Sequence, residues 1–360
     1  MCLSYEATIL KVRIQGESTI NTHDALQHTI EDMVQKGKGI LAADESMPTM
    51  VKRFAPIGVE STEENRRHYR SLLFSTPQLS EFVSGVILFE ETLAQTAADG
   101  TPLAEVLSRQ GIVPGIKVDK GKGPLPGAAG DLITYGLDGL AERLQGYKQQ
   151  GARFAKWREV YPITANNPTP LGLTANAEML ARYAAVCQAE GIVPIVEPEV
   201  LMDGDHSMER CAEVIERVLH EVFHALHRHA VILEHMVLKP SMVTPGKENA
   251  TRASPEQVAT ATVAVLRRTV PAAMPSINFL SGGQGPEEAT ANLNAMNAQF
   301  QQLPWELSFS YGRALQQPAL QAWQGKSAND SAAQQALLKR ARLNGSARWG
   351  QYRPEMESNG

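Results

Sequence analysis

Eight short apolar runs recur along this chain, and each of them ends in polar or charged residues. Their approximate centres lie at residues 41, 87, 116, 155, 195, 237, 278 and 308. The intervals of about 30 to 45 residues leave room for a helix after each run, and strands that alternate with helices form parallel sheets. Eight such units predict a single α/β domain with a closed (β/α)8 barrel of the TIM type; an open doubly wound sheet is the alternative.

Helix-start signals lie in the gaps between these runs. Ser254 precedes a proline and has Gln257 three residues later, which is the pattern of a capping box. Ser61 and Glu64 form a second pair of this kind. The sequence therefore predicts helices that begin next to both serines.

The barrel pattern makes residues 1–360 one domain with three parts. Residues 1–38 are polar with a helical pattern, and we expect them to form a helical lead-in on the surface. The barrel occupies about residues 39–325, and residues 326–360 form a C-terminal tail. With 43% apolar residues, the chain has enough material for one large core.

Charge, hydropathy and cysteine usage argue against several classes of protein. A net charge of -5 does not suit a surface for nucleic acid or for an anionic membrane. No apolar stretch reaches the roughly 18 residues of a membrane-spanning helix, and the N-terminus lacks the pattern of a secretory signal. Cys2, Cys187 and Cys211 make no paired framework, so we expect a cytoplasmic protein with reduced thiols.

Charged and small polar residues gather where the apolar runs end. In a parallel barrel the carboxyl ends of all strands meet on one face, where active sites form. The residues at these ends are Asp44, Glu90, Lys117, Asp119, Lys156, Arg158, Glu197, Glu199, Lys239, Ser281 and Arg313. We therefore expect them to share one site.

Lys239 ends a buried apolar run, and Pro240 stops the strand directly after it. A lysine in this position either keeps its charge beside a carboxylate or loses its proton and becomes a neutral amine. A neutral lysine amine attacks carbonyl carbon and forms a Schiff base. The alternative is an ordinary strand-end lysine with a carboxylate partner.

Residues two positions apart on a strand point to the same face. Two pairs of charged residues have this spacing, Lys156 with Arg158 and Glu197 with Glu199. If these face inward, Lys156 lies near the strand-end lysine, and a neighbouring cation favours a neutral amine. Glu197 suits the general acid that imine formation needs, and Asp44 suits a group that holds or deprotonates a substrate hydroxyl. The alternatives are plain salt bridges for the two pairs and a helix cap for Asp44.

Glycine-rich loops follow the last two runs, at residues 281–285 and at Gly312 with Arg313. Glycines let backbone N–H groups approach an anion, and arginine binds phosphate with two hydrogen bonds. Loops after strands seven and eight often form the phosphate site of such barrels. Lys117 and Arg53 suit a second anionic end of the substrate.

Seven motifs stand in a fixed order along the chain: GILAADES at 39–46, GIKVDKG at 115–121, FAKWR at 154–158, VPIVEPE at 193–199, LKP at 238–240, FLSGGQ at 279–284 and FSYGRA at 309–314. From about residue 25 to 330 the sequence resembles class I fructose-bisphosphate aldolase. The resemblance implies an eight-stranded barrel, commonly a homotetramer. It also implies reversible cleavage of fructose 1,6-bisphosphate to dihydroxyacetone phosphate and glyceraldehyde 3-phosphate in glycolysis and gluconeogenesis, through a lysine Schiff base without metal or other cofactor.

By the same resemblance, Lys239 forms the Schiff base and Glu197 is the main acid and base, with Glu199 in support. Asp44 and Lys156 assist carbon–carbon cleavage. The residues that match one phosphate site are Ser281, Gly282, Gly312 and Arg313. The residues that match the other phosphate end are Ser46, Arg53, Lys117 and Arg158.

Two positions depart from the family pattern. The animal enzymes end in a tyrosine on a mobile tail that helps to protonate the enamine, whereas the last tyrosine here is Tyr352. Thr49, after Pro48, stands where the family has a serine. The group that protonates the enamine therefore stays open.

The segment from His220 to His224 reads H-E-x-x-H, which on a helix suits a zinc hydrolase. It lies in the expected crossover helix between strands five and six, away from the strand ends. A metal-dependent aldolase and a catalytically silent sugar-phosphate-binding protein are further alternatives. The sequence leaves open the preference among fructose 1,6-bisphosphate, fructose 1-phosphate and a seven-carbon bisphosphate.

Overall fold

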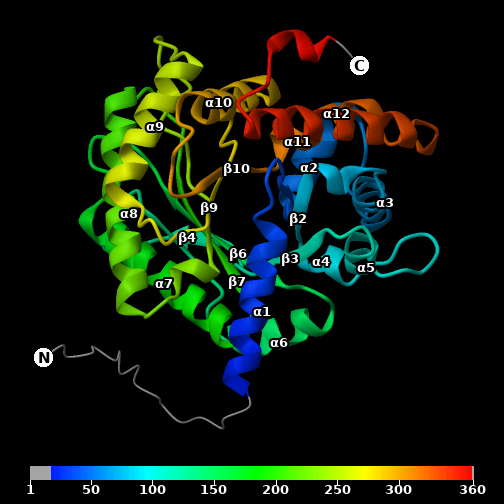
Figure 1. Ribbon diagram of the computed structural model, residues 1–360, viewed down its shortest axis with the longest axis horizontal. Coiled ribbons are helices and arrows are strands. Elements are labelled where there is room, and N and C mark those ends of the chain that lie inside the picture. The colour runs from blue at the N-terminus through cyan, green and yellow to red at the C-terminus, as the bar shows by residue number, and fades with distance from the viewer. Residues whose placement is uncertain (1–17, 359–360) are drawn as a thin grey trace, which may run out of the picture.

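The computed structural model describes the backbone of residues 18–358 and the side chains of residues 22–358. In this part of the chain, eight parallel strands close into a barrel in the order β1-β10-β9-β8-β7-β6-β3-β2 (Figure 1). The barrel strands are β1 Gly39–Ala43, β2 Val83–Leu88, β3 Val113–Lys117, β6 Phe154–Tyr161, β7 Val193–Val200, β8 Val237–Leu238, β9 Ser276–Phe279 and β10 Glu306–Tyr311. Each predicted centre falls inside one of these strands, so the barrel prediction is confirmed. The open sheet is excluded because β1 pairs with both β2 and β10.

Two further strands form a small antiparallel hairpin outside the barrel, β4 Lys122–Pro124 and β5 Leu132–Thr134. The hairpin lies between β3 and β6 in the sequence, and β5 contacts β6. The sequence pattern did not reveal these two strands, because each has only three residues.

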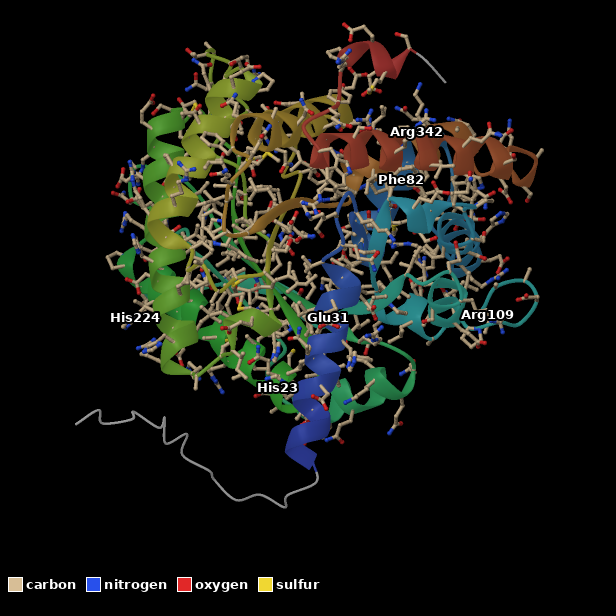
Figure 2. All side chains as sticks on the ribbon, in the orientation of Figure 1. His23, Glu31, Phe82, Arg109, His224 and Arg342 are labelled. Atoms are coloured by element: carbon tan, nitrogen blue, oxygen red, sulfur yellow. The ribbon has the colours of Figure 1, made fainter. Side chains whose placement is uncertain are left out.

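Helices surround the barrel, and side chains such as His224 project outward from them (Figure 2). They are α1 Ser18–Met33, α2 Met47–Phe54, α3 Glu63–Phe74, α4 Glu90–Leu93, α5 Leu103–Ser108, α6 Leu140–Gln149, α7 Pro170–Ala189, α8 Met208–Arg228, α9 Pro255–Thr269, α10 Pro286–Gln299, α11 Arg313–Trp323 and α12 Asp330–Arg348.

The two predicted capping boxes have different outcomes. At α9 the box of Ser254 and Gln257 is confirmed, with both of its hydrogen bonds present. The prediction for Ser61 is wrong by one residue, since Thr62 caps α3 and its side chain accepts a hydrogen bond from the Asn65 N–H. The helix begins one residue later than the Ser61 pattern requires, at Glu63.

Helix α1 closes the amino end of the barrel rather than lying on the surface as a simple lead-in. Its side chains Leu26, Ile30 and Met33 are buried in one cluster with residues that begin strands, among them Val113 and Phe154. The expected helix is thus found at 18–33, but its apolar stripe is part of the core. Residues 1–17 of the predicted lead-in lie outside the described residues.

The ring of Phe154 fills the interior of the barrel near this end. A Cβ atom on Gly115 would lie 2.2 Å from the Phe154 ring, and one on Gly85 would lie 3.2 Å from it. Glycine at Gly115 therefore makes room for an aromatic side chain inside the barrel.

The C-terminal tail contains a long helix that packs on the barrel domain. Helix α12 lies against α10 and α11 (Figure 1). The buried Arg348 donates hydrogen bonds to the carbonyls of Leu307 at 2.6 Å and Lys38 at 3.0 Å. These bonds tie the end of α12 to the loop before β1 and to β10, so the tail up to this point is an integral part of the fold.

Candidate active site

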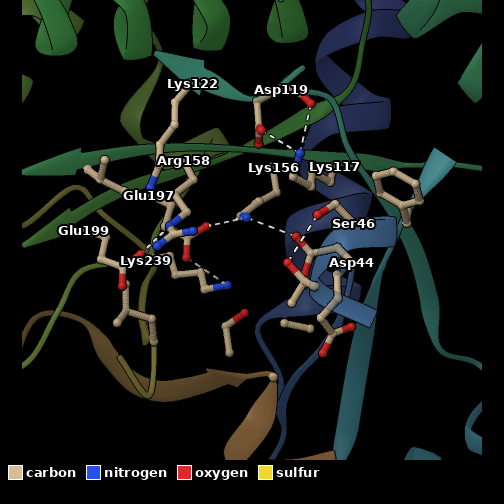
Figure 3. A pocket seen from close by; sticks show the side chains of 18 of the residues that line it. Asp44, Ser46, Lys117, Asp119, Lys122, Lys156, Arg158, Glu197, Glu199 and Lys239 are labelled. Atoms are coloured by element: carbon tan, nitrogen blue, oxygen red, sulfur yellow. Dashed lines mark hydrogen bonds and ion pairs between the residues drawn. The ribbon is translucent and has the colours of Figure 1, made fainter. Parts of the chain in front are cut away.

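All of the predicted site residues line a single cavity of about 780 Å³ at the carboxyl ends of the strands (Figure 3). They are Asp44, Ser46, Arg53, Lys117, Lys156, Arg158, Glu197, Glu199, Lys239, Ser281, Gly282, Gly312 and Arg313. The closure of the barrel brings these residues together from seven strand ends and the helix α2.

Lys239 follows the two-residue strand β8. Its N–H donates to the carbonyl of Val196 at 2.8 Å, which continues the pairing with β7, and Pro240 then ends the strand. The residue is 3% exposed, and its Nζ lies 3.2 Å from Glu197 Oε1. The strand thus holds a lysine in the cavity with a carboxylate beside it.

Four buried charges form a continuous chain in the middle of the cavity (Figure 3). Lys156 Nζ lies 3.0 Å from Asp44 Oδ2 and 2.8 Å from Glu197 Oε2. Glu197 reaches Lys239 with its other oxygen. Two lysines and two carboxylates cancel in formal charge, which is the condition for burying such groups.

The chain of charges also fixes where the protons reside. Burial lowers the pKa of Lys156, but the charges of Asp44 and Glu197 outweigh it and hold that pKa above its ordinary value. Burial raises the pKa of Asp44 and of Glu197, but the neighbouring lysines outweigh it and hold both pKa values below their ordinary range. Lys156 is therefore protonated at neutral pH, and both carboxyl groups are ionised.

The charged pairs on β6 (Lys156 and Arg158) and on β7 (Glu197 and Glu199) face the cavity, as predicted. They also form salt bridges with each other, which was the alternative interpretation of these residues. Lys156 pairs with Glu197, and the Arg158 Nε donates to Glu199 Oε2. The two interpretations do not exclude each other, because these paired side chains line the cavity. Asp44 does not cap a helix, since the residue that precedes α2 is Ser46.

The opposite side of the cavity is formed by the loops after β9 and β10. Gly282 and Gly283 have φ angles of 51° and 104°, a region that favours glycine. The Arg313 Nη2 donates to the carbonyls of Gly283 and Gln284, which joins the two loops. The loops thus present backbone groups and one guanidinium to the cavity, as expected for an anion site.

The two departures from the family pattern also have definite places. The hydroxyls of Thr49 and Ser46 lie 3.2 Å apart, so a hydroxyl group is retained at position 49. The Tyr352 hydroxyl donates to Glu357 Oε1 at 2.9 Å, and Tyr352 is not among the residues that line the cavity.

Several cavity residues were not among the predicted site residues. They include Glu45, Lys122 and Ser310. Glu45 is next to Asp44 in the sequence and forms a buried salt bridge with Arg70 at 2.9 Å, so its position after a strand was a usable signal. Lys122 stands on the hairpin, whose strands are too short to show an alternating pattern in the sequence.

The H-E-x-x-H segment lies within α8, and His220 and His224 are exposed there. Among the residues described, no group of three or more histidine, cysteine or acidic side chains is placed to hold a metal ion. Nor does this part of the chain contain a helix long and apolar enough to cross a membrane.

Comparison with known proteins gives consistent matches. Residues 25–360 match the family model described as fructose-bisphosphate aldolase class-I. The chain is 56% identical over 330 residues to a fructose-bisphosphate aldolase of Drosophila melanogaster, with 91% of each chain covered. It is 56% identical over 317 residues to fructose-bisphosphate aldolase 6, cytosolic, of Arabidopsis thaliana, with 88% of each chain covered.

The structure is also similar to that of fructose-bisphosphate aldolase from Plasmodium falciparum, solved in complex with TRAP and a small molecule inhibitor. The TM-score is 0.91 at 51% sequence identity, over 92% of this chain and 96% of that chain. Sequence and structure therefore point to the same family.

Proposed function

Because this chain belongs to the class I fructose-bisphosphate aldolase family, we propose that Lys239 is the lysine that forms its Schiff base. The chain is a metal-independent aldehyde lyase that reversibly cleaves fructose 1,6-bisphosphate to dihydroxyacetone phosphate and glyceraldehyde 3-phosphate, a glycolytic reaction. The observation that carries the assignment of Lys239 is its position: a buried amine 3.2 Å from Glu197, in the middle of a cavity with cationic groups at both ends.

The first steps need a neutral amine and then an acid. Glu197 is ionised at rest, so it accepts a proton from Lys239 across this short distance. The amine attacks carbon two of the ketose and forms a carbinolamine. Glu197 returns its proton to the departing hydroxyl, water leaves, and a protonated imine remains.

The protonated imine then draws electrons from the bond between carbons three and four. The hydroxyl on carbon four loses its proton to Glu197 or to Asp44, and glyceraldehyde 3-phosphate leaves. Lys156, which stays charged between these two carboxylates, lies where it can stabilise the negative charge that develops on the carbon-four oxygen as its proton leaves. Protonation of carbon three of the enamine and hydrolysis of the imine release dihydroxyacetone phosphate.

Each phosphate group is assigned to one end of the cavity by its distance from the reacting carbon. Strand β9 is the neighbour of β8, so Ser281 and Gly282 lie next to Lys239 and suit the phosphate on carbon one. Lys117 and Arg158 stand on β3 and β6, across the cavity, and suit the phosphate on carbon six. Binding both phosphates places the reacting carbons against the charged chain.

Two further groups complete these phosphate sites. Gly312 and Arg313 accompany Ser281 on the side of β9 and β10. Ser46, which precedes α2, and Arg53 on α2 complete the rim of the cavity. Glu199 supports catalysis indirectly, because it holds the Arg158 side chain.

The test is reduction with borohydride in the presence of dihydroxyacetone phosphate, followed by peptide mapping. We expect a stable adduct on Lys239 and no adduct in the Lys239→Met variant. The matched control is Lys156→Met, which removes the other buried lysine of the cluster and should still give an adduct on Lys239. An adduct on any other lysine of the wild-type enzyme contradicts the assignment.

We also propose that residues 1–360 form one domain, that the enzyme is a homotetramer, as is common in this family, and that it acts in the cytoplasm. The cytosolic name of the Arabidopsis relative supports the location. Light scattering coupled to gel filtration measures the mass of the assembly, and a monomeric mass contradicts the proposed tetramer.

A further inference from the structure

The hairpin of β4 and β5 forms one edge of the cavity, and Lys122 is its first residue. The side chain extends from the hairpin toward Arg158 (Figure 3). It thus stands at the end of the cavity that we assign to the phosphate on carbon six.

The backbone that carries Lys122 is firmly attached to the barrel. Lys122 pairs with Thr134 across the hairpin. The Thr134 N–H donates to Glu159 Oε2 at 3.1 Å, and its hydroxyl donates to the carbonyl of Arg158 at 2.8 Å. Two bonds to β6 therefore fix the hairpin, and with it the backbone of Lys122, at the edge of the cavity.

Lys122 differs from its cationic neighbours in having no carboxylate partner. Lys117 forms an ion pair with Asp119, Arg158 with Glu199 and Lys120 with Glu90. Among the described residues none forms an ion pair or a hydrogen bond with the Lys122 side chain. A cation that is already paired offers less charge to a phosphate than one that is not.

The local charge balance supports an anion at this position. Burial is the main cause that lowers the pKa of Lys122 below its ordinary value, and the charge of Arg158 is the second. The charges of Glu199, Asp119 and Asp203 act in the opposite direction. The charge of Arg158 therefore disfavours the charged form of Lys122 in the absence of an anion. A phosphate oxygen between Lys122 and Arg158 would relieve the repulsion between the two cations.

We propose that Lys122 binds the carbon-six phosphate of the substrate together with Lys117 and Arg158, and so determines the preference for bisphosphates over fructose 1-phosphate. This inference rests on the proposed function, because it takes the carbon-six end of the cavity from the placement of Lys239. Lys122 acts on the terminal phosphate and has no part in the chemical steps. Its loss should therefore alter substrate selection and leave catalysis on a monophosphate intact.

The test compares the cleavage of fructose 1,6-bisphosphate and fructose 1-phosphate by the wild type and by Lys122→Met. We expect kcat/KM for the bisphosphate to fall about fivefold, mainly because KM rises. A loss of about fivefold corresponds to the upper end of the contribution of an exposed ion pair. For fructose 1-phosphate, kcat/KM should change less than about twofold. Lys122→Arg should restore the preference for the bisphosphate, and added salt should weaken bisphosphate binding more in the wild type than in Lys122→Met.

The matched control is Lys120→Met, which removes a cation two residues away that Glu90 already neutralises. The ratio of the two kcat/KM values should stay within about twofold of the wild type in this control. An equal loss for both substrates in Lys122→Met, or no loss for either, overturns the inference. Either result leaves borohydride trapping at Lys239 unaffected, so failure here is distinct from failure of the proposed function.

Discussion

Replacing Glu159 by glutamine should remove a pH-dependent part of the folding stability. Glu159 stands on β6 with 0% exposure, and no ion pair with it is found among the described residues. It accepts hydrogen bonds from Trp157 Nε1 at 2.8 Å and from the Thr134 N–H at 3.1 Å. Burial raises the pKa of Glu159, and the nearby charge of Asp119 raises it further. The two hydrogen-bond donors lower the pKa but do not outweigh burial, so the pKa is raised from 4.5 to about 7.

The magnitude follows from the two pKa values. A carboxyl group whose pKa is higher in the folded state binds its proton more tightly there, so ionisation favours unfolding. The stability that the protonated form contributes is complete below the unfolded pKa of 4.5 and is lost as the pH rises through about 7. Between about pH 5.5 and about pH 8.5 the loss is about 2 kcal/mol, at 1.36 kcal/mol for each pKa unit.

The assay is urea denaturation of the wild type and of Glu159→Gln at both pH values. Glutamine has nearly the same shape but does not ionise, so effects of pH on the rest of the protein cancel in the difference between the two proteins. We subtract the unfolding free energy of the variant from that of the wild type at each pH. This difference should fall by about 2 kcal/mol from the lower to the higher pH. Glu60→Gln, which removes an exposed carboxylate, serves as the control.

A difference that is equal at both pH values, within about 0.5 kcal/mol, would refute the reasoning. It would mean that water or a cation reaches the Glu159 carboxyl group in the folded protein. The argument for a buried acid beneath the hairpin would then fail, although the hydrogen bonds of the hairpin would stand.

Five further outcomes are expected. Glu197→Gln should lower kcat for fructose 1,6-bisphosphate by about 10²- to 10⁴-fold, as measured by a coupled assay, because the variant lacks the proposed acid and base. Lys156→Met should move the acid limb of the pH–rate profile to higher pH, because Glu197 then loses a cation that holds its pKa down. Gly115→Ala should lower stability by about 1–3 kcal/mol in urea denaturation, because its Cβ would collide with the Phe154 ring. A chelator, and separately His224→Ala, should leave the cleavage rate unchanged, because no metal takes part and that histidine is exposed on α8.

The barrel was predictable because the same pattern, an apolar run followed by polar residues, occurs eight times along the chain. This pattern identifies the strands even when the register between neighbouring strands is not known. Even β8, with two residues, could be found, since Pro240 marks its end beside Lys239. The site followed from the same pattern, because a parallel barrel brings all strand ends to one face whatever the packing details are.

The missed features depend on short elements or on contacts that sequence alone does not give. Lys122 belongs to a strand of three residues, which is too short for any alternation of apolar and polar positions to show. Helix α1 reads as polar because only a narrow stripe, including Leu26 and Ile30, faces the barrel. Glu159 follows the inward-facing Arg158, so its side chain points to the opposite face of β6. That face is covered by the hairpin, and the burial of Glu159 therefore depends on a contact that the sequence does not reveal.

The structure also changes the physical account of how the amine of Lys239 is prepared. The sequence suggested that the nearby charge of Lys156 would favour a neutral amine, but Glu197 stands between the two lysines and contacts both. Lys156 has a second carboxylate in Asp44, and its raised pKa keeps its own proton in place. In the proposed mechanism Lys156 therefore acts on the Lys239 amine through Glu197, because its charge helps to hold the Glu197 carboxyl group in the ionised form beside that amine.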